Sequence, residues 1–377
     1  MPRRTAFGTK RIHHSSGEPG RSRRRFLLSQ AESIKLAIAC VALAFSFVLH
    51  QTSLTVPTFI VTAACLAVLA TLVGDGTEQL SSRLGPGATG VLQSALGNLP
   101  ELFIGIFALR AGLVGVVQAA LVGSILGNSL LVLGLAFTVG GLRNGTQKFN
   151  VDAPRAIATL TILAVSAIAI PTLAGQFHTP AASHVEALSV ACAVVLLLVF
   201  AAGIPSSLRG GPTSFGGRDE LASVWPVWLA VLVMIFASVA AAFVSDWFVT
   251  ALMPATAALH LSQTFTGLVI VALAGNAVEN VVGVQLMARN EPNYGISVIL
   301  NSSLQVALGL IPALVLLSYV IGAPIPLTLV LPPLLVAALL LAAILGPLIV
   351  YDGESTWLEG ISLIGLYVII AAGFWWG

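Results

Sequence analysis

The sequence has few charged residues. Only 8% of its 377 residues are Asp, Glu, Lys or Arg, whereas 57% are hydrophobic. A soluble domain carries about 25% charged residues, so this chain cannot cover a water-facing surface. Cysteine is also scarce. Cys40, Cys65 and Cys192 stand singly in apolar runs, which excludes a CxxC motif or a disulfide framework. The sequence also lacks zinc-ligand spacing such as HExxH and the phosphate-binding loop of an ATPase.

Long apolar stretches account for this composition. A stretch of about 20 apolar residues predicts a transmembrane helix, and eleven such stretches occur. They lie near 34–50, 54–74, 84–110, 113–140, 153–174, 184–204, 225–251, 263–288, 294–320, 326–349 and 356–376. We therefore predict an all-α polytopic membrane protein of about eleven transmembrane helices, surrounded by membrane lipid.

Basic residues are concentrated near the N-terminus. Eight of the 17 Lys and Arg lie in the first 25 residues, and we predict a disordered cytoplasmic tail over 1–32. If the helices alternate from there, the outer loops hold only Arg110, and the other basic residues fall inside. The exception to the basic inner loops is YDGES at 351–355, which is acidic. The charges predict a cytoplasmic N-terminus, and we expect the bacterial inner membrane as the location.

A polar segment divides the chain into two halves. It is rich in Gly, Pro and Ser, and we predict a cytoplasmic linker over 205–224. An extra N-terminal helix at 33–53 precedes a first half at 54–204, and the second half covers 225–377. Each half has five predicted helices. Because five is odd, the second half is inverted relative to the first, which is the repeat of a secondary transporter.

A GNxxE motif occurs once in each half. GNLPE covers 97–101, and GNAVE begins 178 residues after it, at 275–279. A second polar cluster keeps the same register, because GSILGN at 123–128 corresponds to NSSLQV at 301–306. Glycine lets the backbone leave helical geometry. Irregular backbone inside a membrane is tolerated only where protein or a hydrated cavity covers it. We therefore predict a helix break at each GN pair.

The glutamates of the two motifs are costly in an apolar run. A charged residue at the centre of a membrane helix is disfavoured by about 2.5–3.5 kcal/mol. Two inverted spans would place Glu101 and Glu279 opposite each other near the midplane. Together with carbonyl, Asn and Ser oxygens they would form an all-oxygen site of the kind that Ca²⁺ prefers. Protons and the cation would then compete for the same oxygens. The alternative is that both glutamates stay protonated and only hydrogen-bond between helices.

The paired motifs resemble those of the calcium/proton exchangers in the calcium:cation antiporter superfamily. The first alpha repeat matches over 97–135, and the second over 265–290 and 301–310. The resemblance implies a ten-span core of two inverted halves, with Glu101 and Glu279 as the cation- and proton-binding carboxylates. We expect the residues that line or support this site to be Gly97, Asn98, Ser124, Gly275, Asn276, Ser302, Ser303 and Gln305. By the same likeness, Glu78 and Asp246 would lie on ion access routes.

The predicted function is secondary-active antiport that exports Ca²⁺ in exchange for H⁺, without a resident cofactor. Asn280 stands where the family often has His, and Asn301 where it often has Gly, so ion preference stays open. The alternatives are a Na⁺ or K⁺/H⁺ antiporter of the same fold and a passive cation channel. An intramembrane enzyme is disfavoured, because both acids are Glu and neither lies in a GxGD-like setting. We expect no nucleic-acid partner, and the oligomeric state stays open.

Overall fold

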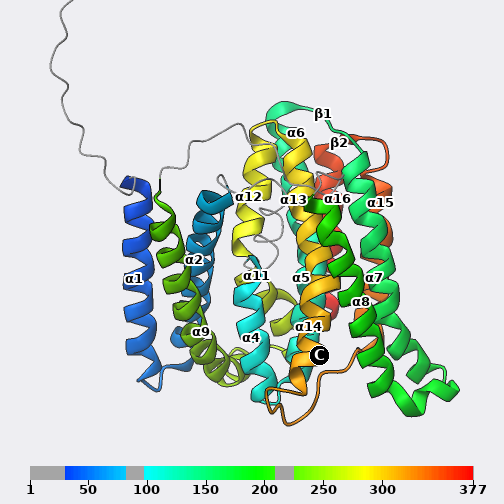
Figure 1. The fold of residues 1–377 in the computed structure, drawn as a ribbon, viewed down its shortest axis with the longest axis horizontal. Helices are drawn as coiled ribbons and strands as arrows, with labels where there is room; N and C mark the ends of the chain where they lie inside the picture. Colours follow the sequence, from blue (N-terminus) through cyan, green and yellow to red (C-terminus); the bar gives the residue numbers. More distant parts are fainter. Residues whose placement is uncertain (1–29, 82–96, 209–224, 377) are drawn as a thin grey trace, which may run out of the picture.

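The computed structural model describes residues 30–81, 97–208 and 225–376, without the side chains at positions 78, 81, 204–208 and 277–279. These residues form a helical bundle with a two-stranded ribbon at one end (Figure 1). In the ribbon, β1 (Gln147–Lys148) pairs antiparallel with β2 (Glu354–Ser355). We call this the ribbon end of the molecule, and the end that carries Arg110 the opposite end.

The helices follow most of the predicted apolar stretches. Those before the linker are α1 (Gln30–His50), α2 (Thr55–Ser81), α4 (Leu99–Arg110), α5 (Val114–Leu126), η1 (Gly127–Val132), α6 (Leu133–Asn144), α7 (Asp152–Gln176), η2 (Pro180–His184) and α8 (Val185–Leu208). Those after it are α9 (Val227–Ala258), α10 (Gln263–Phe265), η3 (Thr266–Val271), α11 (Ala272–Gly275), α12 (Ala277–Ala288), α13 (Pro292–Gln305), η4 (Val306–Leu310), α14 (Ile311–Ser318), α15 (Pro333–Ile349) and α16 (Trp357–Gly373). Helix α8 continues four residues into the range predicted as linker, and 209–224 lie outside the described residues.

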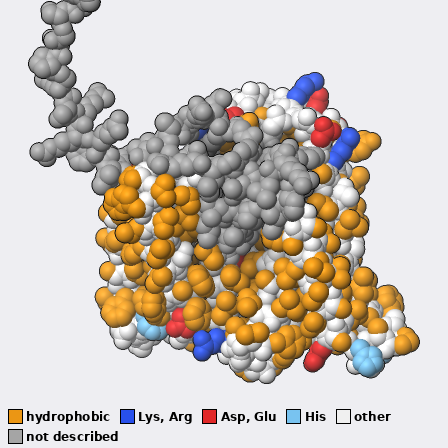
Figure 2. All heavy atoms as spheres, viewed as in Figure 1, with side chains coloured by type: hydrophobic (Ala, Val, Ile, Leu, Met, Phe, Trp, Pro, Cys, Tyr) orange, Lys and Arg blue, Asp and Glu red, His pale blue; other side chains and the backbone are white. Residues whose placement is uncertain are grey.

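Length and composition support the predicted membrane architecture. Within the described ranges, seven helices are long and apolar enough to span a membrane, and a bent pair at 263–288 makes an eighth candidate. Apolar side chains cover the flank between two ends that carry charged groups (Figure 2). The chain is therefore an integral membrane protein of helical class, whereas the number of eleven spans stays a prediction.

The predicted span at 326–349 is wrong at its start, because α15 begins only at Pro333. The preceding residues, 326–332, belong to no helix or strand and alternate in burial, with Leu327, Leu329 and Leu331 buried. Prolines at 326, 332 and 333 explain the difference. Proline lacks a backbone N–H and disfavours helical geometry in the residue before it. The hydropathy of the stretch contains no information on this distinction.

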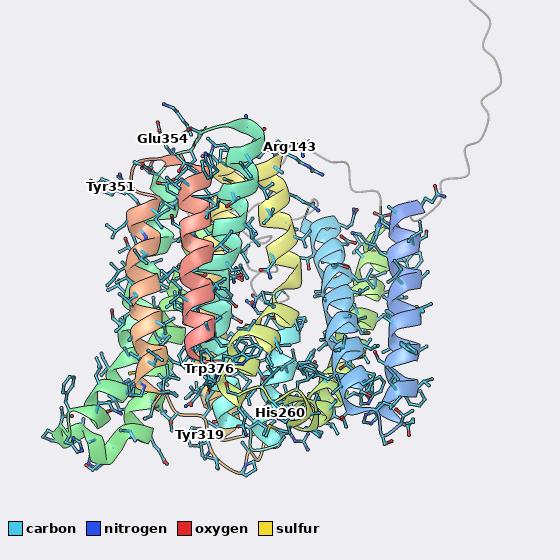
Figure 3. All side chains as sticks on the ribbon, turned by 180° about the vertical axis from the view of Figure 1, so that it is seen from behind. Arg143, His260, Tyr319, Tyr351, Glu354 and Trp376 are labelled. Atoms are coloured by element: carbon cyan, nitrogen blue, oxygen red, sulfur yellow. The ribbon has the colours of Figure 1, made fainter. Side chains whose placement is uncertain are left out.

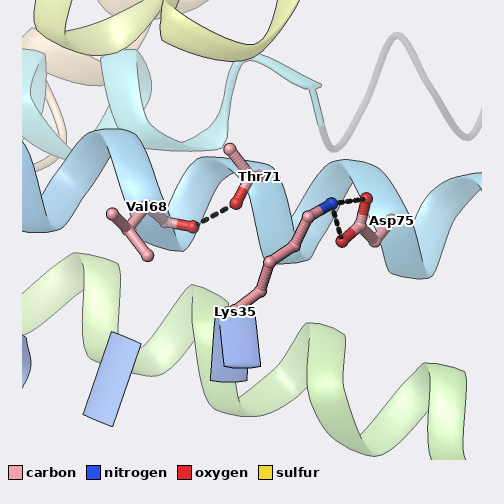
Figure 4. A network of polar contacts seen from close by, with 4 residues as sticks. All are labelled: Lys35, Val68, Thr71 and Asp75. Carbon is pink, nitrogen blue, oxygen red and sulfur yellow. Dashed lines mark hydrogen bonds and ion pairs between the residues drawn. The ribbon is translucent and has the colours of Figure 1, made fainter. Parts of the chain in front are cut away.

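The N-terminal helix α1 packs on α2 and α9. Near the ribbon end, Lys35 Nζ donates to both carboxyl oxygens of Asp75, at 3.0 and 2.8 Å (Figure 4). Near the opposite end, the His50 ring stacks on Trp247 of α9 with centroids 5.4 Å apart. We call α1, α2 and α9 the three-helix layer. Among the described elements, this layer meets the remainder of the bundle mainly through α4, α11 and α12 (Figure 1).

Basic side chains gather at the ribbon end. Among the described residues, the Lys and Arg at this end are Lys35, Arg143, Lys148, Arg155 and Arg289. Arg110 alone of the described Lys and Arg lies at the opposite end. Figure 3 shows Arg143 and Glu354 at one end and His260 and Tyr319 at the other. This distribution places the described inner loops, near 143–155, 289–293 and 351–355, together on one side of the bundle.

Candidate functional site

Each GNxxE motif starts a helix directly after its asparagine. Asn98 precedes α4 with φ −94° and ψ 17°, and Asn276 precedes α12 with φ −92° and ψ 18°. Pro100 lies in the first turn of α4, where its missing N–H costs nothing. In the second repeat, the helices before and after the break are bent by 64°. The prediction of a non-helical residue at both GN pairs is confirmed, and the two have the same backbone geometry.

Glu101 is buried in the first turn of α4 and lies against the break of the other repeat. A Cβ atom on Gly275 would come within 2.6 Å of Glu101 Cγ and 2.9 Å of Cδ, so only glycine leaves room for this carboxyl group. Glu279 holds the equivalent third position of α12, but its side chain lies outside the described residues. That the two carboxyl groups face each other therefore stays a prediction.

Asn276 joins the second break to the first repeat. Its Nδ2 donates to Ser124 Oγ at 2.8 Å and to Ala272 O at 3.0 Å. Its Oδ1 accepts from Asn128 Nδ2 at 3.3 Å, and that same amide donates to Ser302 Oγ at 2.9 Å. Asn128, Ser124, Asn276 and Ser302 are all buried. A chain of polar side chains thus crosses between α5, η1, α11 and α13 inside an apolar bundle.

Two further contacts link the repeats. Asn98 Nδ2 donates to Gln305 Oε1 at 3.2 Å. Ser129 and Ser303 share a hydrogen bond at 3.0 Å between their hydroxyl groups. The structure therefore brings together the predicted neutral site residues of both motifs, with Gly97 half-buried beside Asn98. Their role in ion binding stays a prediction.

Sequence reasoning missed Asn128 and Ser129 as members of this cluster. Both belong to η1, a π-helical segment, and η4 is π-helical at the corresponding place in the second repeat. A π-helical turn holds an extra residue and is frequent at functional sites. The available signal was an asparagine in an apolar run, at the end of GSILGN, whose register had already been matched to the second repeat.

A narrow pocket adjoins the Glu101 carboxyl group. Apart from Glu101 and Ser124, its lining is apolar and comes from α4, α5, η3, α11 and α14. It follows α4 from Glu101 to Ala108, toward the opposite end of the molecule. No three His, Cys, Asp or Glu side chains converge in the described parts of the chain. The ligands on offer are therefore carboxylate, hydroxyl and amide oxygens, which are the donors that hard cations prefer.

Of the two predicted access residues, only Asp246 has a described side chain, and no described hydrogen bond joins that side chain to the polar cluster. Asp246 is exposed on α9, next to the buried Ser245. The side chain of Glu78, in α2, lies outside the described residues. A role for either residue in ion access stays a prediction.

Residues 54–205 and 228–376 match the sequence model of the sodium/calcium exchanger protein family. The chain belongs to this family. A Ca²⁺/H⁺ antiporter of Synechocystis sp. is 35% identical over 339 residues, which covers 84% of this chain and 90% of that protein. The Ca²⁺/H⁺ antiporter ChaA of Bacillus subtilis is 34% identical over 322 residues, with 84% and 91% covered.

A solved structure of native YfkE has the same fold. It superposes with a TM-score of 0.76 at 31% identity and covers 91% of this chain and 99% of that one. Together with the antiporter relatives, this match confirms the calcium/proton exchanger resemblance predicted from the paired motifs. Both of these relatives are named as antiporters, which are transporters, and this agrees with the family assignment.

Proposed function

We propose that this exchanger-family protein is an antiporter that exports Ca²⁺ in exchange for H⁺, and that Glu101 and Glu279 alternately bind the cation and protons. One observation carries the proposal. The buried carboxyl group of Glu101 packs on Gly275, directly before the second helix break, beside polar side chains from both repeats. The antiporter names of relatives that match most of the chain support the choice of ions.

The polar cluster gives each step a physical basis. The carboxylates supply the negative charge that matches a divalent cation, and the Ser and Asn oxygens complete an all-oxygen coordination shell. Protonation from the other side of the membrane removes this charge and releases the cation. Asn276 separates α11 from α12, and Asn98 directly precedes α4, so α4 and α12 can each move about the residue before them. The transported ions are substrates, and the mechanism needs no resident cofactor.

We place the protein in a bacterial inner membrane with the ribbon end in the cytoplasm. The basic side chains at this end support that orientation through the positive-inside rule. The relatives in Synechocystis and Bacillus support a bacterial setting. The cavity along α4 would then approach Glu101 from the outer side.

Reconstituted vesicles with an internal pH indicator test the proposed ions. Addition of Ca²⁺ on one side is expected to drive proton movement in the opposite direction. Na⁺ and K⁺, offered singly, are expected to give a smaller response. A proton response to Na⁺ or K⁺ alone would replace Ca²⁺ with the monovalent alternative. Ca²⁺ flux without proton movement would identify a passive channel.

Glu101→Gln and Glu279→Gln, made singly, are expected to reduce exchange to the level of empty vesicles. Gln keeps the size of the side chain but cannot alternate between a proton and a cation. Glu186→Gln, at an exposed position in α8, is the matched control and is expected to keep wild-type exchange. Thermal unfolding in detergent checks that all three variants fold. Transport that survives in both site variants would remove the central assignment.

A further inference from the structure

Side chains from the end of α6 and from the connection between α6 and α7 hold the end of α12. Gln147 Nε2 donates to Met287 O at 3.0 Å and to Asn290 Oδ1 at 2.9 Å, and Asn144 Nδ2 donates to Met287 O at 3.1 Å. Gln147 is only 2% exposed. Gly140 leaves it room, because a Cβ there would overlap Gln147 Oε1. We call Asn144, Gln147 and Asn290 the α12 clamp.

The connection that provides the clamp is itself fixed to the bundle. Its strand β1 pairs with β2, which leads directly into α16. The Phe149 N–H donates to Gly353 O at 2.9 Å, and the Asn150 N–H donates to Asn293 Oδ1 in α13 at 2.7 Å. The clamp therefore joins the end of α12 to a connection that is also bonded to α13 and to the segment that leads into α16.

The clamp is an addition to a backbone turn that both repeats share. Asn290, after α12, has φ +62°, and Gly112, at the equivalent place after α4, has φ +76°. The same two bonds close both turns: Gly112 N to Leu109 O (3.0 Å) with Leu113 N to Ala108 O (2.8 Å), and Asn290 N to Met287 O (3.0 Å) with Glu291 N to Leu286 O (3.0 Å). The turn can therefore form with glycine at this position, without the Asn290 side chain. Asparagine tolerates this left-handed region less well than glycine does, and here its side chain accepts a clamp bond.

The first repeat has no equivalent of the clamp. In the repeat register, Asn290 corresponds to Gly112, Asn144 to Gly322 and Gln147 to Ile325. Glycine and isoleucine side chains carry no hydrogen-bonding group. The atom nearest to a Cβ built on Gly112 is the apolar Pro324 Cγ, at 3.9 Å. The side-chain bonds thus act on one broken helix and not on its inverted partner.

We infer that Asn144, Gln147 and Asn290 are positioning residues that anchor α12, and with it the backbone of Glu279, and so favour the conformation of this structure over its alternate. This inference rests on the proposed antiport. In an inverted repeat, the two access states arise when the halves exchange conformations. Bonds present in one half alone make these states unequal in free energy. Loss of one such bond is expected to shift their ratio by about two- to tenfold.

Asn290→Gly and Gln147→Ala test the inference in reconstituted vesicles of known orientation. The half-saturating Ca²⁺ concentration is measured separately from each face. Apparent affinity falls as the competent state becomes rarer, so it is expected to weaken about two- to tenfold from one face and to strengthen from the other. Lys148→Met, which removes the exposed ion pair with Glu354 in the same ribbon, is the control and is expected to change neither value.

A second measurement does not require transport. In a background without the native cysteines, Ala108→Cys places a thiol in the cavity beside α4, and a membrane-impermeant maleimide reports its accessibility. Asn290→Gly is expected to change the labelling rate about two- to tenfold. The inference would be overturned if the half-saturating Ca²⁺ concentration stayed the same, or changed in the same direction, at both faces and the labelling rate did not change. The clamp would then be only a stabilising contact. Wild-type protein without Ca²⁺-driven proton movement would instead refute the antiport, while the labelling rates would still decide whether the clamp shifts the conformation.

Discussion

Glu101 and Gly275 lie against each other although they belong to different repeats. The carboxyl group occupies the space that any larger side chain at position 275 would need. The second GN pair therefore has two structural roles, and the sequence motif alone does not show that they are distinct. Its asparagine interrupts one helix, and its glycine gives room to the acid of the other. The position of the Glu101 side chain in the first motif thus depends on the absence of a Cβ atom at Gly275 in the second.

Gly275→Ala is expected to displace the Glu101 carboxyl group, because the new Cβ would lie 2.6 Å from Glu101 Cγ. Proton-coupled Ca²⁺ flux is expected to fall about 100-fold, since a misplacement of ~1 Å in a functional group can cost that much. Gly115→Ala is the control, because a Cβ there meets nothing within 4 Å. Equal flux in the two variants would show that the contact with Gly275 has no influence on transport.

Residue patterns predicted the acids and most of the polar cluster, but not Asn128 or Ser129. Glu101 stands out because a carboxylate in an apolar run is costly. Ser124 and Ser302 stand out because they keep the repeat register. The contacts of Asn128 with Asn276 and Ser302 depend on the direction of its side chain from η1. That direction follows from a π-helical turn, which no residue spacing in the sequence marks.

At the scale of helices and loops, the helix starts at the two GN pairs were predicted from the sequence, whereas the start of α15 was not. The GN pairs mark the starts of α4 and α12 because glycine and asparagine favour irregular backbone. The start of α15 was missed because the whole range 326–349 is apolar. Its non-helical part, 326–332, has buried leucines at alternate positions, and period-two burial is typical of extended chain. Polar side chains from neighbouring helices satisfy its backbone.

Thr172→Val is expected to destabilise the protein by about 1–3 kcal/mol, because it leaves buried backbone groups of this non-helical segment unpaired. The Thr172 hydroxyl donates to Leu329 O at 2.9 Å and accepts from the Leu331 N–H at 2.8 Å. Thr159→Val, which removes an exposed bond to Arg155 O in its own helix, is the control. It is expected to cost less than about 0.5 kcal/mol. Thermal unfolding in detergent compares them, and equal midpoints would contradict this account of the segment.

For the whole molecule, charge and helix order predicted the sides of the membrane. The described basic residues other than Arg110 gather at the ribbon end. The expected inversion rests on the predicted odd number of spans in each half, whereas the packing between the halves could not be predicted from a count of spans. Helix partners depend on close approaches such as that of Gly134 to Gly360 between α6 and α16. The presence of a glycine in the sequence does not predict which helix will pack against it.

Two cysteine variants test the orientation, in a background without the native cysteines. Lys148→Cys lies at the ribbon end and Val320→Cys at the opposite end, and the native side chain is 80% exposed at both positions. A membrane-impermeant maleimide is expected to label Val320→Cys from outside intact cells, and Lys148→Cys only in inside-out vesicles. The reverse pattern would mean that the ribbon end faces outward.

The three-helix layer lies at the edge of the bundle, where most of the surface of α1 is not covered by the other described helices. Its main contacts with the other described helices are with α4, α11 and α12, the segments on which both GN breaks lie. A change in bilayer thickness or lateral pressure that shifts this layer would therefore act first on the helices around Glu101.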